Sequence, residues 1–233
     1  DEYSYIYTKV KTRDDAAFHI TTYKDNKFLE QTLVDEIERL KETDEDYWRV
    51  YGLGQVGRNR ATVFKFNECD EIPARAKLIA RGLDWGFVND PSVLVATYVL
   101  ENNMYIDELF YKYGMTNRDI HNELTKLNLT RADQIFADSS EPKSIDELYR
   151  YGWNIKAATK GKDSIMLGID LMKRYNIFIT SRSANTIQEF RNYKWLEDKN
   201  GNLLNKPEDK NNHAVDSTRY SIFTRLSRPN VAR

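Results

Sequence analysis

The stretch that decides the fold is "GLDWGF", residues 82–87, which ends an otherwise apolar run over residues 76–83. Such a run, followed by small turn residues, predicts a buried strand. Asp84 lies where this strand meets the turn. A lone carboxylate at the edge of a core is costly unless it is paired or bound to a cation. Asp84 is therefore a candidate metal ligand at the end of a strand, and the segments around it indicate the fold.

Three strand-like segments, 77–86, 91–100 and 104–113, begin the regular part of the chain. Turn residues separate them, at Asn89-Asp90-Pro91 and at Glu101-Asn102-Asn103. Links this short predict antiparallel hairpins.

Strands and helices then alternate. A helix at 116–128 opens with Thr116 and Asp119, a variant of the capping box. The next helix is expected to begin after Ser140 as its cap and to end before Gly152. The remaining segments are strands at 134–138, 153–157 and 177–179, and helices at 141–151, 163–174, 184–191 and 213–226.

This order is that of the ribonuclease H-like fold. We expect an α/β domain with a mixed five-stranded sheet, helices on both faces and a hairpin insertion. The insertion covers about residues 194–212 and is expected to turn at Asn200-Gly201. It directly precedes the last helix, so it is either a gate for access to the site or a plain surface insertion.

Three acids are expected to meet in this fold. The first and fourth strands lie side by side and parallel, which makes their carboxyl ends a topological switch point. Asp84 and Asp138 end these strands. Adjacent strands lie about 4.8 Å apart, so the two carboxylates could share one ion. On the last helix, Val215, Ile222 and Leu226 form a packing stripe, whereas His213, Asp216 and Tyr220 share another face that can be aimed at the strand ends.

Carboxylate oxygens suit Mg²⁺ or Mn²⁺, and two such ions about 3.5 to 4 Å apart would organise a phosphodiester for in-line attack. Taken singly, each acid has an ordinary alternative. Asp84 is then a turn acid, Asp138 a cap of the following helix and Asp216 a solvated helical acid. Their joint placement favours the metal site.

Composition excludes several other kinds of site. Cys69 is the only cysteine and there are only three histidines among 233 residues, so neither a disulfide nor a cysteine-based zinc cluster is expected. The formal charge of −1 gives no global signal for nucleic acid, so a local patch would have to bind it. No run approaches the roughly 20 apolar residues of a membrane span, and no signal-peptide pattern opens the chain. We expect a cytoplasmic protein without a membrane anchor.

At these residues the chain resembles the nuclease part of the large terminase subunit of tailed bacteriophages, which packages DNA into procapsids. The matching stretches are "GLDWGFVNDPSVL", "IFADSSEPKSIDEL", "KGKDSIMLGID" and "NNHAVDSTRY", in the order of the family. Two further stretches, "TTYKDNKFL" and "YGLGQVG", resemble the segment that joins the ATPase motor to the nuclease. We therefore expect an N-terminal extension over residues 1–70, with a helix at about 30–46, and a nuclease domain over residues 71–233.

The resemblance implies a metal-dependent endonuclease that cuts concatemeric viral double-stranded DNA and uses two divalent cations, Mg²⁺ or Mn²⁺. It carries Asp84, Asp138 and Asp216 over as the catalytic, metal-binding acids. His213 either assists near the metal or the scissile phosphate, or has a capping or surface role. The chain has no GxxxxGK[ST] phosphate loop, so no ATPase activity is expected from it.

The resemblance also implies partners: double-stranded DNA, the small terminase subunit, the portal of the procapsid and an ATPase domain of the same polypeptide. The expected location is the host cytoplasm and not the mature virion. Lys160 and Lys162, in "TKGKDS", are candidate DNA contacts before a helix start, or else belong to a solvated turn capped by Asp163 or Ser164. The four arginines after Ser217 either contact DNA or another terminase part, or form a soluble tail.

Two other functions remain open at this point. One is another enzyme of the same fold, such as a junction resolvase, a transposase-like strand transferase or a ribonuclease. The other is a non-catalytic DNA-binding or assembly module that uses its carboxylates for structure. Substrate choice separates the first from a terminase nuclease, and metal-independent behaviour would indicate the second.

Overall fold

The computed structural model describes residues 10, 13–43, 48–55, 61–161, 163–198 and 202–227. The chain divides into two compact units, Asp1–Arg60 and Ala61–Arg233. The sequence-based boundary between residues 70 and 71 would instead leave a strand of the second unit, β1, in the first.

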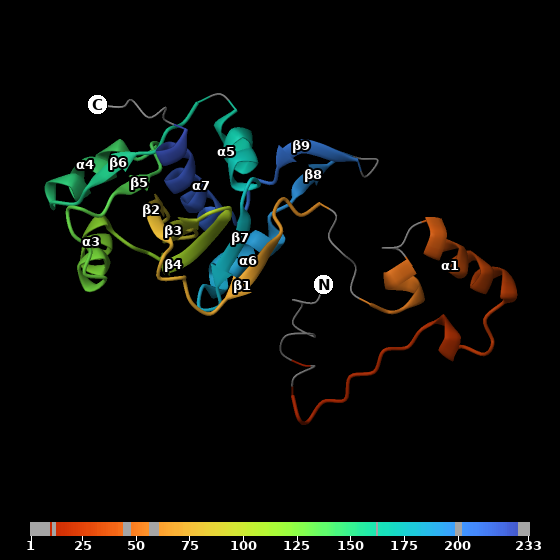
Figure 1. Ribbon diagram of the computed structural model, residues 1–233. Helices are drawn as coiled ribbons and strands as arrows, with labels where there is room; N and C mark the ends of the chain where they lie inside the picture. Colours follow the sequence, from red (N-terminus) through yellow and green to blue (C-terminus); the bar gives the residue numbers. More distant parts are fainter. Residues whose placement is uncertain are drawn as a thin grey trace. The chain divides into compact units, whose positions relative to one another are not determined.

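The first unit is built from short helical segments (Figure 1). They are the 3-10 turn η2 (Tyr23–Asp25), helix α1 (Gln31–Thr43) and the π-helical turn η3 (Trp48–Gly52). Helix α1 lies within the helix expected at 30–46, of which residues 44–46 fall outside the described part. No residue of α1 is buried.

In its described residues, the second unit contains a mixed sheet of seven strands in the order β1-β7-β4-β3-β2-β5-β6. Their bounds are β1 (Phe66–Cys69), β2 (Lys77–Asp84), β3 (Pro91–Leu100), β4 (Asn103–Tyr113), β5 (Ile135–Ala137), β6 (Ile155–Ala157) and β7 (Asn176–Thr180). The ribonuclease H-like fold is confirmed, with seven strands in place of the five expected. The sheet is wider because β7 pairs in parallel with β4, and β1, which precedes the expected domain, pairs in parallel with β7.

Strand pairing follows the predicted hairpins. β2 and β3 are antiparallel, and so are β3 and β4. β2 also pairs in parallel with β5, where Leu83 lies opposite Ala137. The first and fourth of the predicted strands are therefore neighbours, as the sequence indicates, and their carboxyl ends meet at one edge of the sheet.

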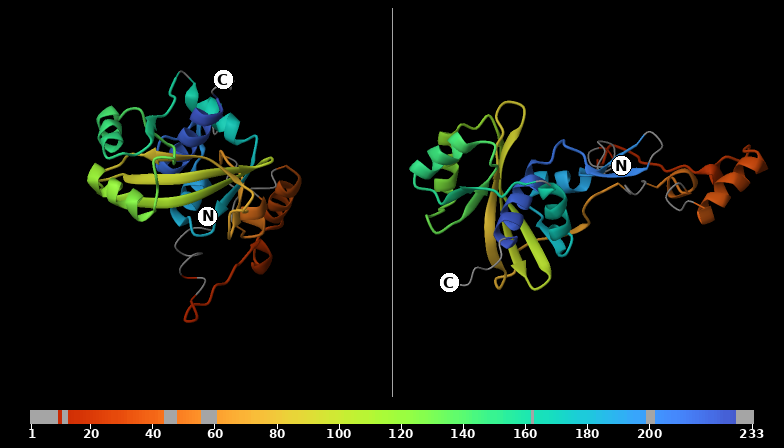
Figure 2. Two further views of the ribbon diagram at one scale, coloured as in Figure 1. Left: turned by 60° about the vertical axis from the view of Figure 1, so that its left-hand side comes forward. Right: turned by 90° about the horizontal axis from the view of Figure 1, so that it is seen from above.

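Helices cover both faces of the sheet, as predicted. They are α3 (Asn117–Lys126), α4 (Pro142–Arg150), α5 (Ser164–Met172), α6 (Ala184–Asn192) and α7 (His213–Leu226). Seen from above, α3 and α4 lie on one side of the strands and α5, α6 and α7 on the other (Figure 2). Among the described residues, no helix has the length and apolar character required to cross a membrane.

The alternation of side chains along β3 explains why there are two cores. Val93 and Val95 belong to the core that α5, α6 and α7 cover, whereas Leu94 between them belongs to the core under α3 and α4. All three side chains are fully buried. A strand that is apolar on both faces is what a sheet covered by helices on both sides requires.

Local signals at the helix ends are mostly as expected. Thr116 and Asp119 form the capping box of α3, and Gly152 has a φ of 100° just after α4. The cap expected at Ser140 is wrong, because Glu141 is the N-cap residue of α4 and makes no side-chain cap bond. Ser140 instead donates its backbone N–H to Asp138. The packing stripe on α7 includes Val215 and Ile222, but Leu226 is 39% exposed near the helix end.

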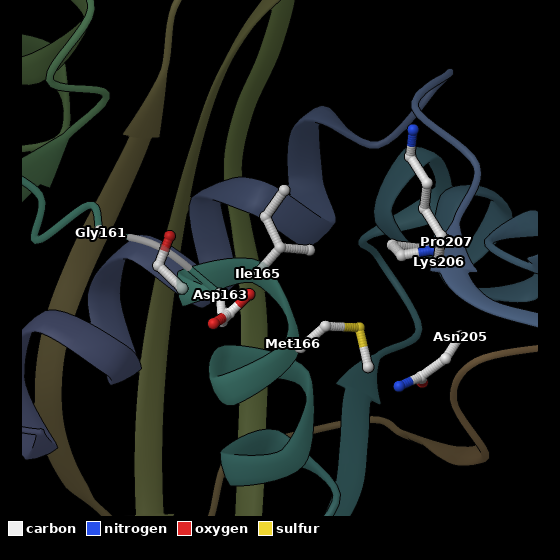
Figure 3. Close-up of a pocket in the computed structure, with 8 residues that line it drawn as sticks. Gly161, Asp163, Ile165, Met166, Asn205, Lys206 and Pro207 are labelled. Atoms are coloured by element: carbon white, nitrogen blue, oxygen red, sulfur yellow. The ribbon is translucent and has the colours of Figure 1, made fainter.

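The polar insertion is the antiparallel hairpin of β8 (Trp195–Glu197) and β9 (Leu203–Pro207). Its expected turn at Asn200-Gly201 falls outside the described residues. β9 borders a groove of about 270 Å³ at the start of α5, where Met166 reaches from the helix toward Asn205 (Figure 3). The hairpin thus lines the α5 side of the domain, and a gating role for it stays a prediction.

Candidate active site

Two acids lie at the switch point of the sheet. Asp84 is the last residue of β2, and Asp138 follows β5 directly. The backbone N–H of Asp138 donates to the carbonyl oxygen of Leu83 at 3.1 Å, so the parallel pairing continues to the level of both acids. The structure therefore brings these two carboxylates to the same edge, as the sequence indicates.

Asp84 is held in an environment that opposes its charge. It is 8% exposed. Burial raises the pKa of Asp84 to about 6; the Asp216 and Asp138 carboxylates also act to raise it, while His213 acts to lower it. Because carboxylates are normally ionised well below this pH, the site stores unfavourable electrostatic energy that a cation would relieve.

A glycine lets the last helix reach this edge. A Cβ atom at Gly82, two residues before Asp84, would lie 1.7 Å from the carbonyl oxygen of Ser217 on α7. The hydroxyl of Ser217 also donates to the Val93 carbonyl at 3.1 Å. α7 therefore packs directly against the backbone of β2 and β3, and its first turn is placed beside Asp84.

His213, the first residue of α7, contacts Asp84. The distance between His213 Nδ1 and Asp84 Oδ2 is 2.9 Å, and that between His213 Nε2 and Asp90 Oδ1 is 3.5 Å. The hydrogen bond with Asp84 is the main cause that raises the pKa of His213. The histidine thus lies between two acids, and its ring is oriented by Asp84.

Asp216 lies one turn further along α7. Its Oδ1 accepts from Nε and Nη2 of Arg219 at 3.1 and 3.0 Å. Burial raises the pKa of Asp216 although Arg219 acts in the opposite direction. Arg219 is 3% exposed. It packs between Asp216 and α5, so closely that a Cβ atom added at Gly168 of α5 would lie 2.5 Å from the Cγ atom of Arg219. Arg219 is therefore part of the site and not part of a free basic tail.

Asp138 has a different set of partners. The backbone N–H of Ser140 donates to Oδ1 at 2.8 Å, the Tyr220 hydroxyl donates to Oδ2 at 3.2 Å, and Lys160 Nζ forms an ion pair with Oδ1. Burial acts to raise the pKa of Asp138, but the Lys160 ammonium and the Ser140 amide outweigh it, and the pKa lies below its usual value. Asp138 is therefore ionised at neutral pH.

Lys160, expected at the DNA, lies within the acidic site. Its Nζ is 5.4 Å from the centroid of the Tyr220 ring, and the neighbouring N–H of Thr159 donates to the Thr224 hydroxyl on α7 at 2.9 Å. The loop that carries Lys160 is thus fixed to α7. Lys162 falls outside the described residues. DNA contacts by either lysine stay a prediction, as do those of the arginine tail, whose residues after Ser227 are also outside the described part.

The donor chemistry fits a divalent cation, since all three acids offer carboxylate oxygens. Their arrangement shows what an ion would displace. Within the described ranges, no group of three His, Cys, Asp or Glu side chains is arranged to hold one metal ion. Asp138 is paired with Lys160 and Asp216 with Arg219. A metal that takes these oxygens must therefore compete with two resident cationic side chains.

Three contacts at the site were not predicted from the sequence: those of Lys160 with Asp138 and of Arg219 with Asp216, and that of the Glu189 carboxylate on α6 with the Ala214 amide in the first turn of α7. Arg219 lies three residues after Asp216, a spacing that puts both on one helix face and that would have indicated the pair. Glu189 and Lys160 are distant in sequence from the groups they contact, so no local signal identifies those contacts.

The strand order and the acids at the switch point define a ribonuclease H-like domain of the nuclease class. The family model for the terminase RNase H-like domain matches residues 84–223, and a model for the phage terminase large subunit matches residues 2–55. The chain belongs to the terminase large subunit family, and it carries the nuclease domain of that family.

A curated relative, the terminase large subunit of a Bacillus phage, agrees with this assignment. The chain is 32% identical to the terminase large subunit of Bacillus phage SPP1 over 225 residues, which are 91% of this chain and 53% of that protein. It spans about half the length of the curated relatives it matches.

Solved structures show the same fold. The large terminase nuclease domain of phage SPP1, crystallised with bound Mn, matches with a TM-score of 0.62 and 32% identity over 69% of this chain and 97% of that one. The large terminase nuclease of thermophilic phage G20c, with bound magnesium, matches with a TM-score of 0.51 and 16% identity over 70% of this chain and 97% of that one, and supports the fold alone.

Proposed function

We propose that this chain is a metal-dependent endonuclease that cuts concatemeric viral double-stranded DNA during genome packaging. The observation that carries the proposal is the burial of Asp84 at the end of β2, beside the end of β5 that Asp138 follows, with the Asp216 and Asp138 carboxylates near enough to help raise its pKa. A buried carboxylate whose ionisation is opposed by two neighbouring acids has a clear use as a ligand of a divalent cation. Membership of the terminase family and the Mn-bound structure of a 32% identical nuclease domain support it.

We assign the acids as ligands of two ions, Mg²⁺ or Mn²⁺, with Asp84 and Asp138 holding one and Asp84 and Asp216 the other. When bound, such ions activate a water molecule and stabilise the leaving oxygen of the phosphodiester. The protein's own groups prepare the site. His213 orients the Asp84 carboxylate through its 2.9 Å contact, and Tyr220 and the Ser140 amide orient that of Asp138.

Lys160 and Arg219 neutralise the acids before metal binds. An ion held by the Asp138 oxygens would compete with Lys160 for them, and the freed ammonium would then be available to a phosphate of the DNA backbone. This reconciles its position beside Asp138 with the DNA contact expected for it. His213, whose Nδ1 contacts Asp84 at 2.9 Å, is our candidate for a contact with the metal or the scissile phosphate.

The proposed partners follow from the family. They are double-stranded DNA, the small terminase subunit, the portal of the procapsid and an ATPase domain of the same polypeptide, in the cytoplasm of the infected host. The matching model of the phage terminase large subunit over residues 2–55 supports the role of the first unit as the segment next to the motor.

The test is the conversion of supercoiled plasmid to nicked, linear and degraded forms in EDTA, Mg²⁺ or Mn²⁺. We expect cutting with a divalent ion and none in EDTA. Asp84→Asn should abolish cutting without loss of the fold, since it removes an ionic ligand and leaves the shape. Asp146→Asn is the matched control, because Asp146 is an exposed acid on α4 that pairs with Arg150 at 2.8 Å. Cutting by Asp84→Asn at the wild-type rate would exclude the assignment, and DNA binding without metal-dependent cutting would favour the binding-module alternative.

A further inference from the structure

Helix α7 carries two of the site residues in its first turn, yet it does not cap its own start. Its N-cap residue, Asn212, makes no side-chain cap bond. The first N–H groups of a helix have no partner within the helix, and a start without a cap frays. Since His213 and Asp216 both lie in this turn, a loose start would misplace both.

The missing cap is supplied by a side chain from another helix. Oε2 of Glu189, on α6, accepts from the backbone N–H of Ala214 at 2.6 Å and from that of Val215 at 3.4 Å. A carboxylate at a helix N-terminus is also favoured by the helix dipole. Glu189 therefore does for α7 what an N-cap side chain does in other helices.

The other oxygen of Glu189 ties this cap to the sheet. Oε1 accepts from the Tyr111 hydroxyl, on β4, at 2.8 Å. Glu189 is 4% exposed, so its carboxylate is held by β4 and α7 in a site from which water is largely excluded. A buried carboxylate with three donors has little freedom to move, and it links α6, β4 and the first turn of α7.

We infer that Glu189 is a positioning residue for the active site, which sets the first turn of α7 and thereby the places of His213 and Asp216 beside Asp84. The inference rests on the proposed function, because it gives that site a supporting residue. Groups behind the direct ligands of a metal commonly change its affinity by about 10- to 100-fold when removed. Within the described part of the chain, Glu189 forms no hydrogen bond or ion pair with Asp84 or Asp138. It contacts the first turn of α7 through two backbone N–H groups, and its charge also acts to raise the pKa of His213.

The test compares Glu189→Ala with Ser221→Ala in the 233-residue chain. Ser221 is a suitable control because it is also buried on α7 and hydrogen-bonded, to Thr97 at 2.7 Å, but lies far from the first turn. Two quantities are measured: amide hydrogen exchange at Ala214 and Val215 without metal, and the Mn²⁺ concentration that gives half of the maximal rise in melting temperature.

In Glu189→Ala we expect faster exchange at both amides, by about tenfold or more, and a Mn²⁺ requirement raised by about tenfold or more. Ser221→Ala should change neither. Glu189→Gln should restore most of both properties, because its amide oxygen can accept the same two N–H groups. Tyr111→Phe, which removes only the donor to Oε1, should give a smaller change in the same direction and serves if Glu189→Ala does not fold.

Equal exchange at Ala214 and Val215 in Glu189→Ala and Ser221→Ala would overturn the inference, as would an unchanged Mn²⁺ requirement in Glu189→Ala. Failure of the proposed function is recognised separately. If Mn²⁺ neither stabilises the wild-type chain nor supports cutting, the proposed function is wrong, and the exchange measurement, made without metal, still decides whether Glu189 holds the turn.

Discussion

Both faces of the sheet have an apolar core, but helix α7 also buries a row of polar side chains on its face. Under α3 and α4 the core is apolar, with Ile120, Leu124 and Leu148 fully or almost fully buried. α7, on the other face, buries polar side chains along most of its length, namely Ser217, Thr218, Arg219, Ser221 and Thr224. Apolar packing is non-directional, whereas each buried polar group requires a partner at a defined distance and angle. The α3–α4 face is therefore suited to stability, and the α7 face to holding a site in one geometry.

The largest effect is expected from Gly82→Ala, which disrupts the packing of α7 against the sheet. The new methyl group would overlap the Ser217 carbonyl, and a backbone atom cannot move away without shifting α7. We expect the free energy of unfolding to fall by about 4 kcal/mol or more, with loss of plasmid cutting. Urea unfolding and the plasmid assay measure the two effects. Gly161→Ala, where the added Cβ meets nothing within 4 Å, should stay near wild-type stability, and a stable, active Gly82→Ala would show that α7 does not pack this closely.

Leu148→Ala tests the α3–α4 face. Leu148 is fully buried, so its truncation leaves a cavity and should cost about 2 to 5 kcal/mol of stability. Cutting should persist below the new melting temperature, because Asp84, Asp138 and Asp216 are not members of this apolar core. Tyr149→Ala, at a neighbouring position that is 65% exposed, is the control and should change stability little. Loss of cutting in folded Leu148→Ala would mean that the two faces are not independent.

A smaller and pH-dependent effect is expected from Asp84→Asn without metal. The pKa of Asp84 is raised to about 6 in the folded chain, against about 3.9 in an unfolded one. Below pH 4 the group is protonated in both states and costs nothing. As the pH rises from 4 through 6, Asp84 ionises first in the unfolded state. The free energy of unfolding therefore falls by roughly 1 to 3 kcal/mol over this range.

Asparagine is neutral at every pH, so Asp84→Asn should match the wild-type chain near pH 4 and melt a few degrees higher near pH 8 in EDTA. Thermal unfolding of both proteins between these pH values measures the difference, with Asp146→Asn as the control. If Asp84→Asn is less stable than the wild type at pH 8, the contact with His213 outweighs the cost of burying the charge.

Much of the fold could be predicted because its signals are local. The hairpins between β2, β3 and β4 follow from Asn89-Asp90-Pro91 and Glu101-Asn102-Asn103, and Thr116 with Asp119 marks the start of α3. The strand count could not be predicted, because the pairing of β1 with β7 joins segments more than one hundred residues apart. Nor could the change of cap at α4, where the Ser140 amide serves Asp138 instead.

The positions of the acids were readable from the chain for a physical reason: a strand end is set by its own residues, and parallel neighbours bring their ends together. Asp84, Asp138 and Asp216 follow from that rule and from helical spacing. The environment of these acids could not be predicted from the sequence. The approach of α7 over Gly82, the pairing of Lys160 with Asp138 and the cap from Glu189 all arise from contacts between distant segments. Such contacts set burial, charge and the pKa of Asp84, because these depend on which groups surround a side chain in space and not on its neighbours along the chain.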